Sequence, residues 1–101
     1  MKSKFEKCLE SGKPVVLAFF HYTNEDAAVI KEDVEKLRAE FGDKCEFLLV
    51  DGPDNHELAH KCHVDVYPAW VMFKGGQEVW NGGGIKKYQT VADTVRGFLE
   101  D

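Results

Sequence analysis

The chain has 101 residues, of which 44% are hydrophobic, and its formal net charge at pH 7 is −5. This length predicts a single domain, residues 1–101, whose hydrophobic core needs no disulfide or metal to support it. The negative charge argues against nucleic acid or an anionic membrane surface as a partner, because both need clustered Lys and Arg.

The amino-terminal residues Met1–Glu6 are too charged for a signal peptide. No stretch has the roughly 18 consecutive apolar residues that a membrane-spanning helix needs. The cysteines Cys8, Cys45 and Cys62 have no spacing typical of a disulfide framework. We therefore expect a cytoplasmic protein with reduced thiols.

The first predicted element is a short helix from about Lys4 to Glu10. Ser3 is expected to be its N-cap, and Glu6 stands where it can complete a capping box. Val15–Phe20 follows as a continuous apolar run, which is typical of a strand buried on both faces.

The next helix is predicted to begin at Thr23 or Asn24, with one of them as its cap and with Glu25 and Asp26 in its first turn. Its apolar residues recur every three or four positions until Gly42: Ala27, Ile30, Val34, Leu37 and Phe41. The strand that follows, Phe47–Val50, is therefore predicted to pair in parallel with the first strand, because a helix of this length separates them.

A third helix is predicted after Pro53, with Asp54 as its cap and Glu57 completing a capping box. Residues 69–73 and 78–80 flank Gly75 and Gly76 and predict a hairpin at the far edge of the sheet. In the last helix, Thr90 and Asp93 are expected to form a capping box, and the buried stripe comprises Val91, Val95, Phe98 and Leu99. The predicted fold class is α/β, a mixed sheet of about four strands with helices on both faces.

Several segments, in this order, together resemble the thioredoxin-like superfamily: Lys13–Phe20, Glu40–Lys44, Phe47–Asp51, Glu57–Val64 and Val66–Gly76. The resemblance extends from about Lys13 to Leu99. It implies a three-layer α/β/α sandwich.

The resemblance also shows which chemistry to expect, because a thioredoxin carries Cys-x-x-Cys directly after its first core strand. Those positions here are Asn24, Glu25, Asp26 and Ala27. Dithiol exchange needs a nucleophilic thiolate and a second, resolving thiol, and neither is present in this segment. The positions of the family's buried Asp and its Lys partner correspond to Ala18 and Leu49. We therefore expect no catalytic dithiol, no cofactor and no proton relay.

Pro68, preceded by Tyr67, corresponds to the family's cis-proline, whose loop presents backbone groups to an extended substrate. The resemblance therefore predicts a groove for a protein or peptide partner, lined by Tyr22, Thr23, Tyr67, Pro68, Gly83 and Gly84. The alternative explanation of the proline is that the fold simply needs this turn.

A competing hypothesis is a thiol-disulfide oxidoreductase that works through a single thiol, Cys62 or Cys45. Cys62 precedes the proline loop but lies at a helix C-terminus, where the dipole disfavours a thiolate. Cys45 follows the cation of Lys44. A third possibility is a structural subunit with no groove activity.

The segment His56-Glu57-Leu58-Ala59-His60 matches H-E-x-x-H, the zinc motif of metalloproteases. The predicted helix is too short, and a chain of this size lacks a second lobe to form a cleft. His56, His60, Cys62 and His63 also cannot all converge from one helix. We therefore predict no metal site.

Overall fold

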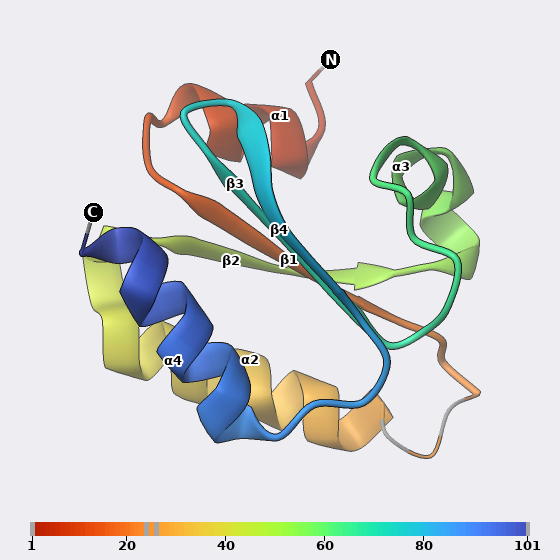
Figure 1. Cartoon of the computed structure of the whole chain (residues 1–101). Helices are drawn as coiled ribbons and strands as arrows, with labels where there is room; N and C mark the ends of the chain where they lie inside the picture. Colours follow the sequence, from red (N-terminus) through yellow and green to blue (C-terminus); the bar gives the residue numbers. More distant parts are fainter. Residues whose placement is uncertain (1, 24, 26, 101) are drawn as a thin grey trace.

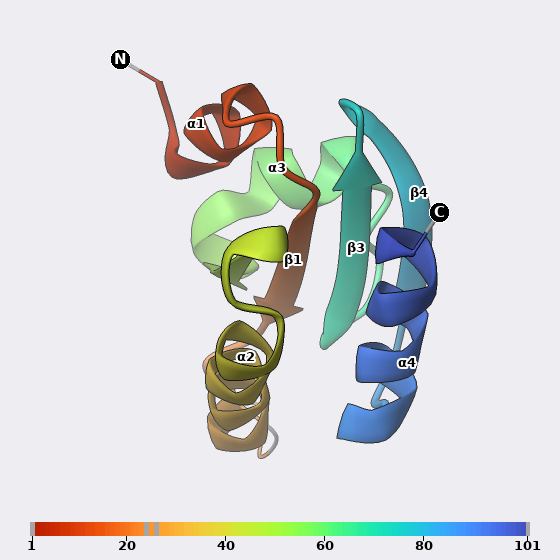
Figure 2. The same ribbon diagram turned by 90° about the vertical axis from the view of Figure 1, so that its left-hand side faces the viewer.

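The computed structural model describes residues 2–23, 25 and 27–100. Its elements, in chain order, are α1 (Lys4–Glu10), β1 (Val15–Phe20), α2 (Ala27–Phe41), η1 (Gly42–Lys44), β2 (Glu46–Asp51), η2 (Pro53–Asn55), α3 (His56–Lys61), β3 (Ala69–Lys74), β4 (Gln77–Gly83) and α4 (Tyr88–Leu99). The strand order is β2-β1-β3-β4, with β1 and β2 parallel and the other two pairs antiparallel. Helices α1 and α3 cover one face of the sheet, and α2 and α4 cover the other (Figures 1 and 2). The predicted α/β fold is confirmed.

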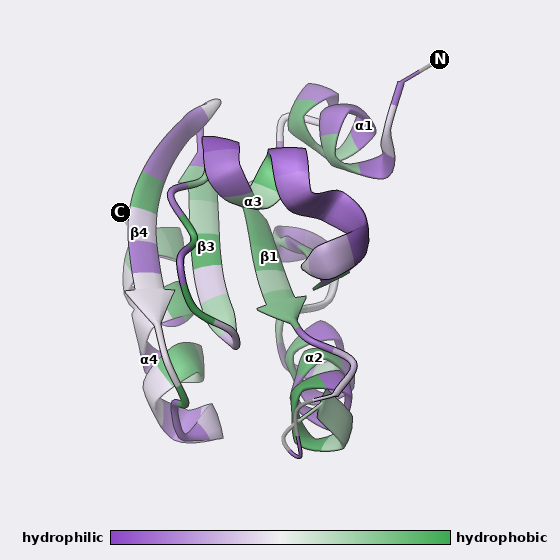
Figure 3. Cartoon of the chain, turned by 90° about the vertical axis from the view of Figure 1, so that its right-hand side faces the viewer, coloured by the Kyte–Doolittle hydropathy of each residue, from purple (hydrophilic) through white to green (hydrophobic). Residues whose placement is uncertain are grey.

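The centre of the molecule is β1, in which all six residues are buried. Because side chains alternate along a strand, β1 contributes to both cores. Val16, Ala18 and Phe20 face α2 and α4, whereas Val15, Leu17 and Phe19 face α1 and α3. The continuous apolar run therefore has the role predicted for it. Figure 3 shows the resulting hydrophobic colour of β1 and β3 beneath the hydrophilic outer surface of α3.

The helix starts were predicted with mixed success. In α1, Ser3 accepts from the backbone of Glu6 at 3.1 Å and the predicted capping box is present. The predicted box at Asp54 and Glu57 is wrong, because a 3-10 turn precedes α3 and no side chain caps α3. Asp51 instead accepts from the Asp54 N–H at 3.2 Å. The carboxylate that organises this turn thus lies three residues before the predicted cap.

The predicted capping box at Thr90 and Asp93 is also wrong, since α4 begins at Tyr88. The Thr90 N–H donates to the Lys87 carbonyl at 3.0 Å, so Thr90 is already inside the first turn. Its own carbonyl accepts from the Thr94 hydroxyl, as in an ordinary helix interior. The predicted buried stripe is nevertheless right at Val91 and Val95, and the remaining two residues of the stripe are half-buried.

The buried face of α2 contains one acid that the apolar periodicity did not reveal. Asp33 is only 6% exposed. Burial raises the pKa of its carboxyl above the ordinary 3.8, Lys36 opposes this shift, and Glu32 adds to it. A carboxyl with a raised pKa in the folded state favours folding when it is protonated. Its contribution is therefore present below about pH 3.8 and is lost as the pH rises through the raised pKa.

We expect Asp33→Leu to raise the free energy of unfolding at pH 7 by about 1–3 kcal/mol, because it removes a buried, poorly compensated charge. The gain should shrink as the pH falls to about 3.8, the pKa of an ordinary Asp. Urea unfolding at both pH values measures this. Asp33→Asn is the matched control, which removes the charge but keeps the size. A loss of stability at pH 7 in both variants would contradict the prediction.

His63, which lies just after α3, has a left-handed φ of 59°. Among the described residues other than glycine, it alone has a positive φ. Its N–H donates to the His60 carbonyl at 3.1 Å, and the Val64 N–H donates to the Ala59 carbonyl at 2.9 Å. These bonds close the helix end in the manner usual for a glycine at this position. His63 therefore holds a backbone conformation that costs an L-residue about 1–2 kcal/mol.

We expect His63→Gly to stabilise the protein by up to about 1 kcal/mol, because glycine adopts this conformation without steric cost. His60→Gly is the matched control on the same helix. It should destabilise by about 1 kcal/mol, since a helix interior disfavours glycine. Thermal melts of the two variants should therefore move in opposite directions. Destabilisation by both would show that His63 makes contacts worth more than its strain.

Candidate functional site

The candidate site lies at one end of the sheet, where β1 ends, β3 begins and β4 ends (Figure 1). The Tyr67–Pro68 peptide bond is cis. The Gly84 N–H donates to the Pro68 carbonyl at 2.9 Å, which fixes the residues after β4 against the proline loop. Gly83 lies beside Val66, since a Cβ on Gly83 would be 3.2 Å from Val66 Cγ2. Four of the six predicted groove residues, Tyr67, Pro68, Gly83 and Gly84, are thus brought together.

The turn after β1 is held by local hydrogen bonds. The Thr23 N–H donates to Nδ1 of His21 at 3.1 Å, and the Thr23 hydroxyl forms a hydrogen bond with the same nitrogen at 2.5 Å. Thr23 therefore does not cap α2, which begins only at Ala27, and Glu25 lies in the turn before it. This corrects the predicted start at Thr23 and the predicted acidic first turn. The alternative cap, Asn24, and Asp26 lie outside the described residues.

Three rings connect this turn to the proline loop. His21 stacks on Tyr22 with ring centroids 5.0 Å apart, and its centroid is 6.2 Å from that of Tyr67. The Tyr67 ring in turn covers Gly52, the residue after β2. Tyr22 is mostly exposed, whereas Tyr67 is half-buried. The two tyrosines predicted to line one groove therefore differ, because one side chain faces solvent and the other packs inward.

Exposed apolar side chains gather around these loops. Among the described residues, four large hydrophobic side chains are exposed, and three of them belong to this end of the sheet: Tyr22 at 66%, Val66 at 54% and Ile85 at 73%. Val66 and Ile85 were not among the predicted groove residues. Their position next to Tyr67 and Gly84 was visible in the sequence, but only the register of the loops shows that they face outward.

None of the three cysteines exposes its thiol fully to solvent. Cys45 and Cys62 are buried, and Cys8 is half-buried. Burial, together with the charge of Glu46, raises the pKa of the Cys45 thiol to about 12. Burial and the charge of Glu78 raise the pKa of Cys62 to about 11. Both environments favour a neutral, inaccessible thiol over a thiolate.

Ala18 and Leu49, which the resemblance matches to the family's buried Asp and its Lys partner, are register partners in the β1–β2 pair. Ala18 is buried and Leu49 is half-buried, and both belong to the core beneath α2 and α4. These two positions therefore supply packing and no group that could carry a proton.

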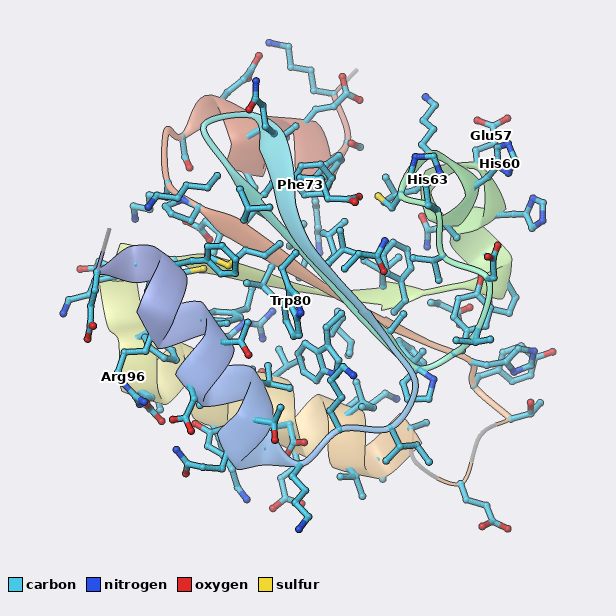
Figure 4. All side chains as sticks on the ribbon, in the orientation of Figure 1. Glu57, His60, His63, Phe73, Trp80 and Arg96 are labelled. Carbon is cyan, nitrogen blue, oxygen red and sulfur yellow. The ribbon has the colours of Figure 1, made fainter. Side chains whose placement is uncertain are left out.

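In the H-E-x-x-H segment of α3, His56, Glu57 and His60 are exposed, whereas Ala59 is buried in the core. Glu57 and His60 point outward from the helix in Figure 4, away from the sheet. Within the described residues, no three side chains of His, Cys, Asp and Glu form a group that could hold a metal ion. None of the described helices is long and apolar enough to cross a membrane.

Comparisons with known proteins complete the description. A family model described as "Thioredoxin" matches residues 1–97. "Thioredoxin H-type" of Fagopyrum esculentum is 33% identical over 84 residues, which are 83% of this chain and 72% of the relative. "Thioredoxin" of Equus caballus is 31% identical over 100 residues, which are 97% of this chain and 93% of the relative.

Solved structures give the same result. The X-ray structure of Fasciola hepatica thioredoxin matches with a TM-score of 0.76 and 28% identity, covering 95% of this chain and 88% of that one. Thioredoxin from Trypanosoma brucei brucei matches with a TM-score of 0.83 and 21% identity, covering 97% and 85%. Because its identity is below 25%, the second match supports the fold alone.

Proposed function

Because this chain belongs to the thioredoxin family, we propose that it is a redox-inactive thioredoxin-like domain that binds extended segments of partner proteins at the proline-loop end of its sheet. One observation supports this proposal above all. Tyr22, Val66 and Ile85 expose apolar surface around Pro68. Exposed apolar surface that gathers in one place favours a binding role.

Loss of dithiol exchange follows from the residues at the helix start. The chain has three cysteines, at positions 8, 45 and 62, and none at positions 24 to 27. Without a thiol at these positions, no mixed disulfide can form there with a bound partner. The groove would then hold a partner by backbone and apolar contacts alone. The three unpaired thiols also agree with the expected cytoplasmic location.

The groove is tested with a phage-displayed library of random peptides selected against the wild-type protein. We expect enriched peptides to be apolar and extended, to bind equally with and without reductant, and to lose about tenfold or more in affinity on Val66→Ser combined with Ile85→Ser. Val29→Ser is the matched control, since Val29 is 53% exposed on α2 and outside the proposed groove. An equal loss in the control, or no enrichment at all, would refute the proposal.

The alternative is thiol-disulfide exchange through a single thiol, Cys62 or Cys45. Similarity to proteins named thioredoxins supports this alternative. Insulin reduction by dithiothreitol separates the two proposals. If the binding proposal is right, insulin should be reduced at the same rate with dithiothreitol alone and with dithiothreitol plus the protein. A rate increase that Cys62→Ser or Cys45→Ser abolishes would establish the thiol function instead.

Alkylation of the native protein tests the thiols directly. At pH 8 we expect Cys62 and Cys45 to react at least about a hundredfold more slowly than cysteine in an unfolded peptide, because both pKa values are raised and both thiols are buried. Cys8, which is half-buried, should react first. Mass spectrometry after timed iodoacetamide treatment measures each rate, and a guanidinium-unfolded sample serves as the control. Fast labelling of Cys62 or Cys45 in the folded protein would contradict this expectation.

A further inference from the structure

His21, the residue directly after β1, closes the turn beside the proposed groove through one ring nitrogen. The Thr23 N–H donates to its Nδ1 at 3.1 Å, and the Thr23 hydroxyl is 2.5 Å from the same nitrogen. Among the described residues, the imidazole makes no other hydrogen bond. The side-chain contribution to this turn therefore depends on the state of Nδ1.

The bond from the Thr23 N–H fixes the charge of the ring. A backbone N–H can only donate, so Nδ1 is the ring nitrogen without a proton. In a neutral imidazole the proton is then on Nε2. An imidazolium carries a proton on both nitrogens and has no acceptor left. The closed turn is therefore compatible only with a neutral His21.

The two bonds to Thr23 respond differently when the ring takes up a proton. The hydroxyl can rotate and accept from Nδ1–H instead of donating to it. The backbone N–H cannot reverse, and it would face another N–H. Thr23 is exposed, so water can accept from its N–H once the turn opens. The cost is one net hydrogen bond, which corresponds to a change of roughly three- to tenfold in the ratio of closed to open turns.

The same ring also contacts two residues of the proposed groove. It stacks on Tyr22 with an interplanar angle of 24°, and it lies against Tyr67 at a tilt of 52°. Tyr22 is one of the exposed apolar side chains on which the proposed groove depends. The turn that His21 closes thus carries one wall of this groove.

The charge of His21 is the one that changes near neutral pH around this turn. The rings against it are the phenols of Tyr22 and Tyr67. The described charged residues of the surrounding turn, helix, strand end and proline loop are Glu25, Lys31, Asp51 and Asp65. Carboxyl, phenol and amine groups ordinarily titrate outside pH 5 to 8, whereas an imidazole ordinarily titrates near pH 6.5.

We propose that His21 makes the groove pH-sensitive: uptake of a proton at Nδ1 opens the turn at Thr23 and weakens the binding of a partner's extended segment. This inference rests on the proposed binding function, because it concerns the regulation of the same groove. A partner that binds the closed turn more tightly must also favour the neutral ring, since the coupling between the two is reciprocal. Binding is therefore tighter at pH 7.5 than at pH 5.5.

The turn is tested first without a peptide, by NMR of the His21 ring nitrogens and the Thr23 amide from pH 5 to pH 8. We expect Nδ1 to be unprotonated at pH 8, and the Thr23 amide signal to shift with the same midpoint as the ring. His21→Asn is the decisive variant, because an Asn side chain accepts the N–H two residues on but takes up no proton. Its Thr23 amide should be independent of pH.

The groove is then tested with acetyl-Ser-Val-Ile-Val-Ser-amide, a peptide that has no group titrating between pH 5 and pH 8. We expect its affinity for the wild-type protein to fall about three- to tenfold from pH 7.5 to pH 5.5. His21→Asn should abolish this pH dependence. His60→Asn, which removes an exposed imidazole on α3, is the matched control and should keep it.

The possible failures give different signals. If the Thr23 amide does not follow the titration of His21, or if His21→Asn keeps the full pH dependence of binding, the proposed regulation is wrong and the groove remains. If the peptide binds at no pH although Thr23 follows His21, the groove is wrong, and the regulation of binding fails with it.

Discussion

Trp70→Ala is expected to lower the free energy of unfolding by about 3–5 kcal/mol. Trp70 is fully buried on β3, in the core between the sheet and the helices α2 and α4. Its neighbours in the sheet are held on both sides, since β3 pairs with β1 and with β4. The backbone therefore cannot collapse into the space that the indole leaves. The whole stability of such a domain is about 5–15 kcal/mol, so urea unfolding should show a large shift of the midpoint.

Trp70→Phe separates the loss of ring contacts from the effect of the indole N–H. The indole N–H of Trp70 is buried and has no hydrogen-bond partner within the described residues. An unpaired buried donor costs about 1–3 kcal/mol, and Phe removes this cost while it keeps most of the ring contacts. We therefore expect Trp70→Phe to stay within about 1 kcal/mol of the wild type. A loss as large as that of Trp70→Ala would show that the shape of the indole, and not its apolar area, determines the packing.

The fold was predictable from the sequence because its strands and helices carry clear apolar periods. Val15–Phe20 is apolar at every position and is the fully buried strand. In α2, the three- and four-residue spacing from Ile30 to Phe41 matches the buried face. Helix starts were less predictable, because capping depends on which hydrogen bonds compete for a side chain. Thr23 bonds to His21 and Asp51 organises η2, and neither choice is visible in a local motif.

Only those residues of the candidate site that match the family's pattern could be predicted. Pro68 and Gly84 could be placed together because the resemblance supplies the topology that joins them. Exposure of Val66 and Ile85 depends on the conformation of two loops, which no periodicity encodes.

The second large effect concerns Gly52, which follows β2 and lies against the Tyr67 ring of the proline loop. A Cβ on Gly52 would lie 2.2 Å from the ring carbons Cε1 and Cζ of Tyr67 and 2.6 Å from its hydroxyl oxygen. Gly52 is buried, and its N–H is bonded to the Phe20 carbonyl, so the backbone cannot move aside at low cost. The Tyr67 ring must therefore leave its place when residue 52 has a side chain.

We expect Gly52→Ala to lower the free energy of unfolding by about 1–3 kcal/mol, because the displaced ring loses its packing against the end of β2. In a Tyr67→Ala background the sign should reverse. The φ of Gly52 is −58°, which alanine adopts readily, so the same substitution should then stabilise by about 0.4–1 kcal/mol through the unfolded chain. Urea unfolding of the four proteins in this double-mutant cycle gives the coupling energy. An equal cost of Gly52→Ala in both backgrounds would mean that the clash with Tyr67 is not what excludes a side chain at position 52.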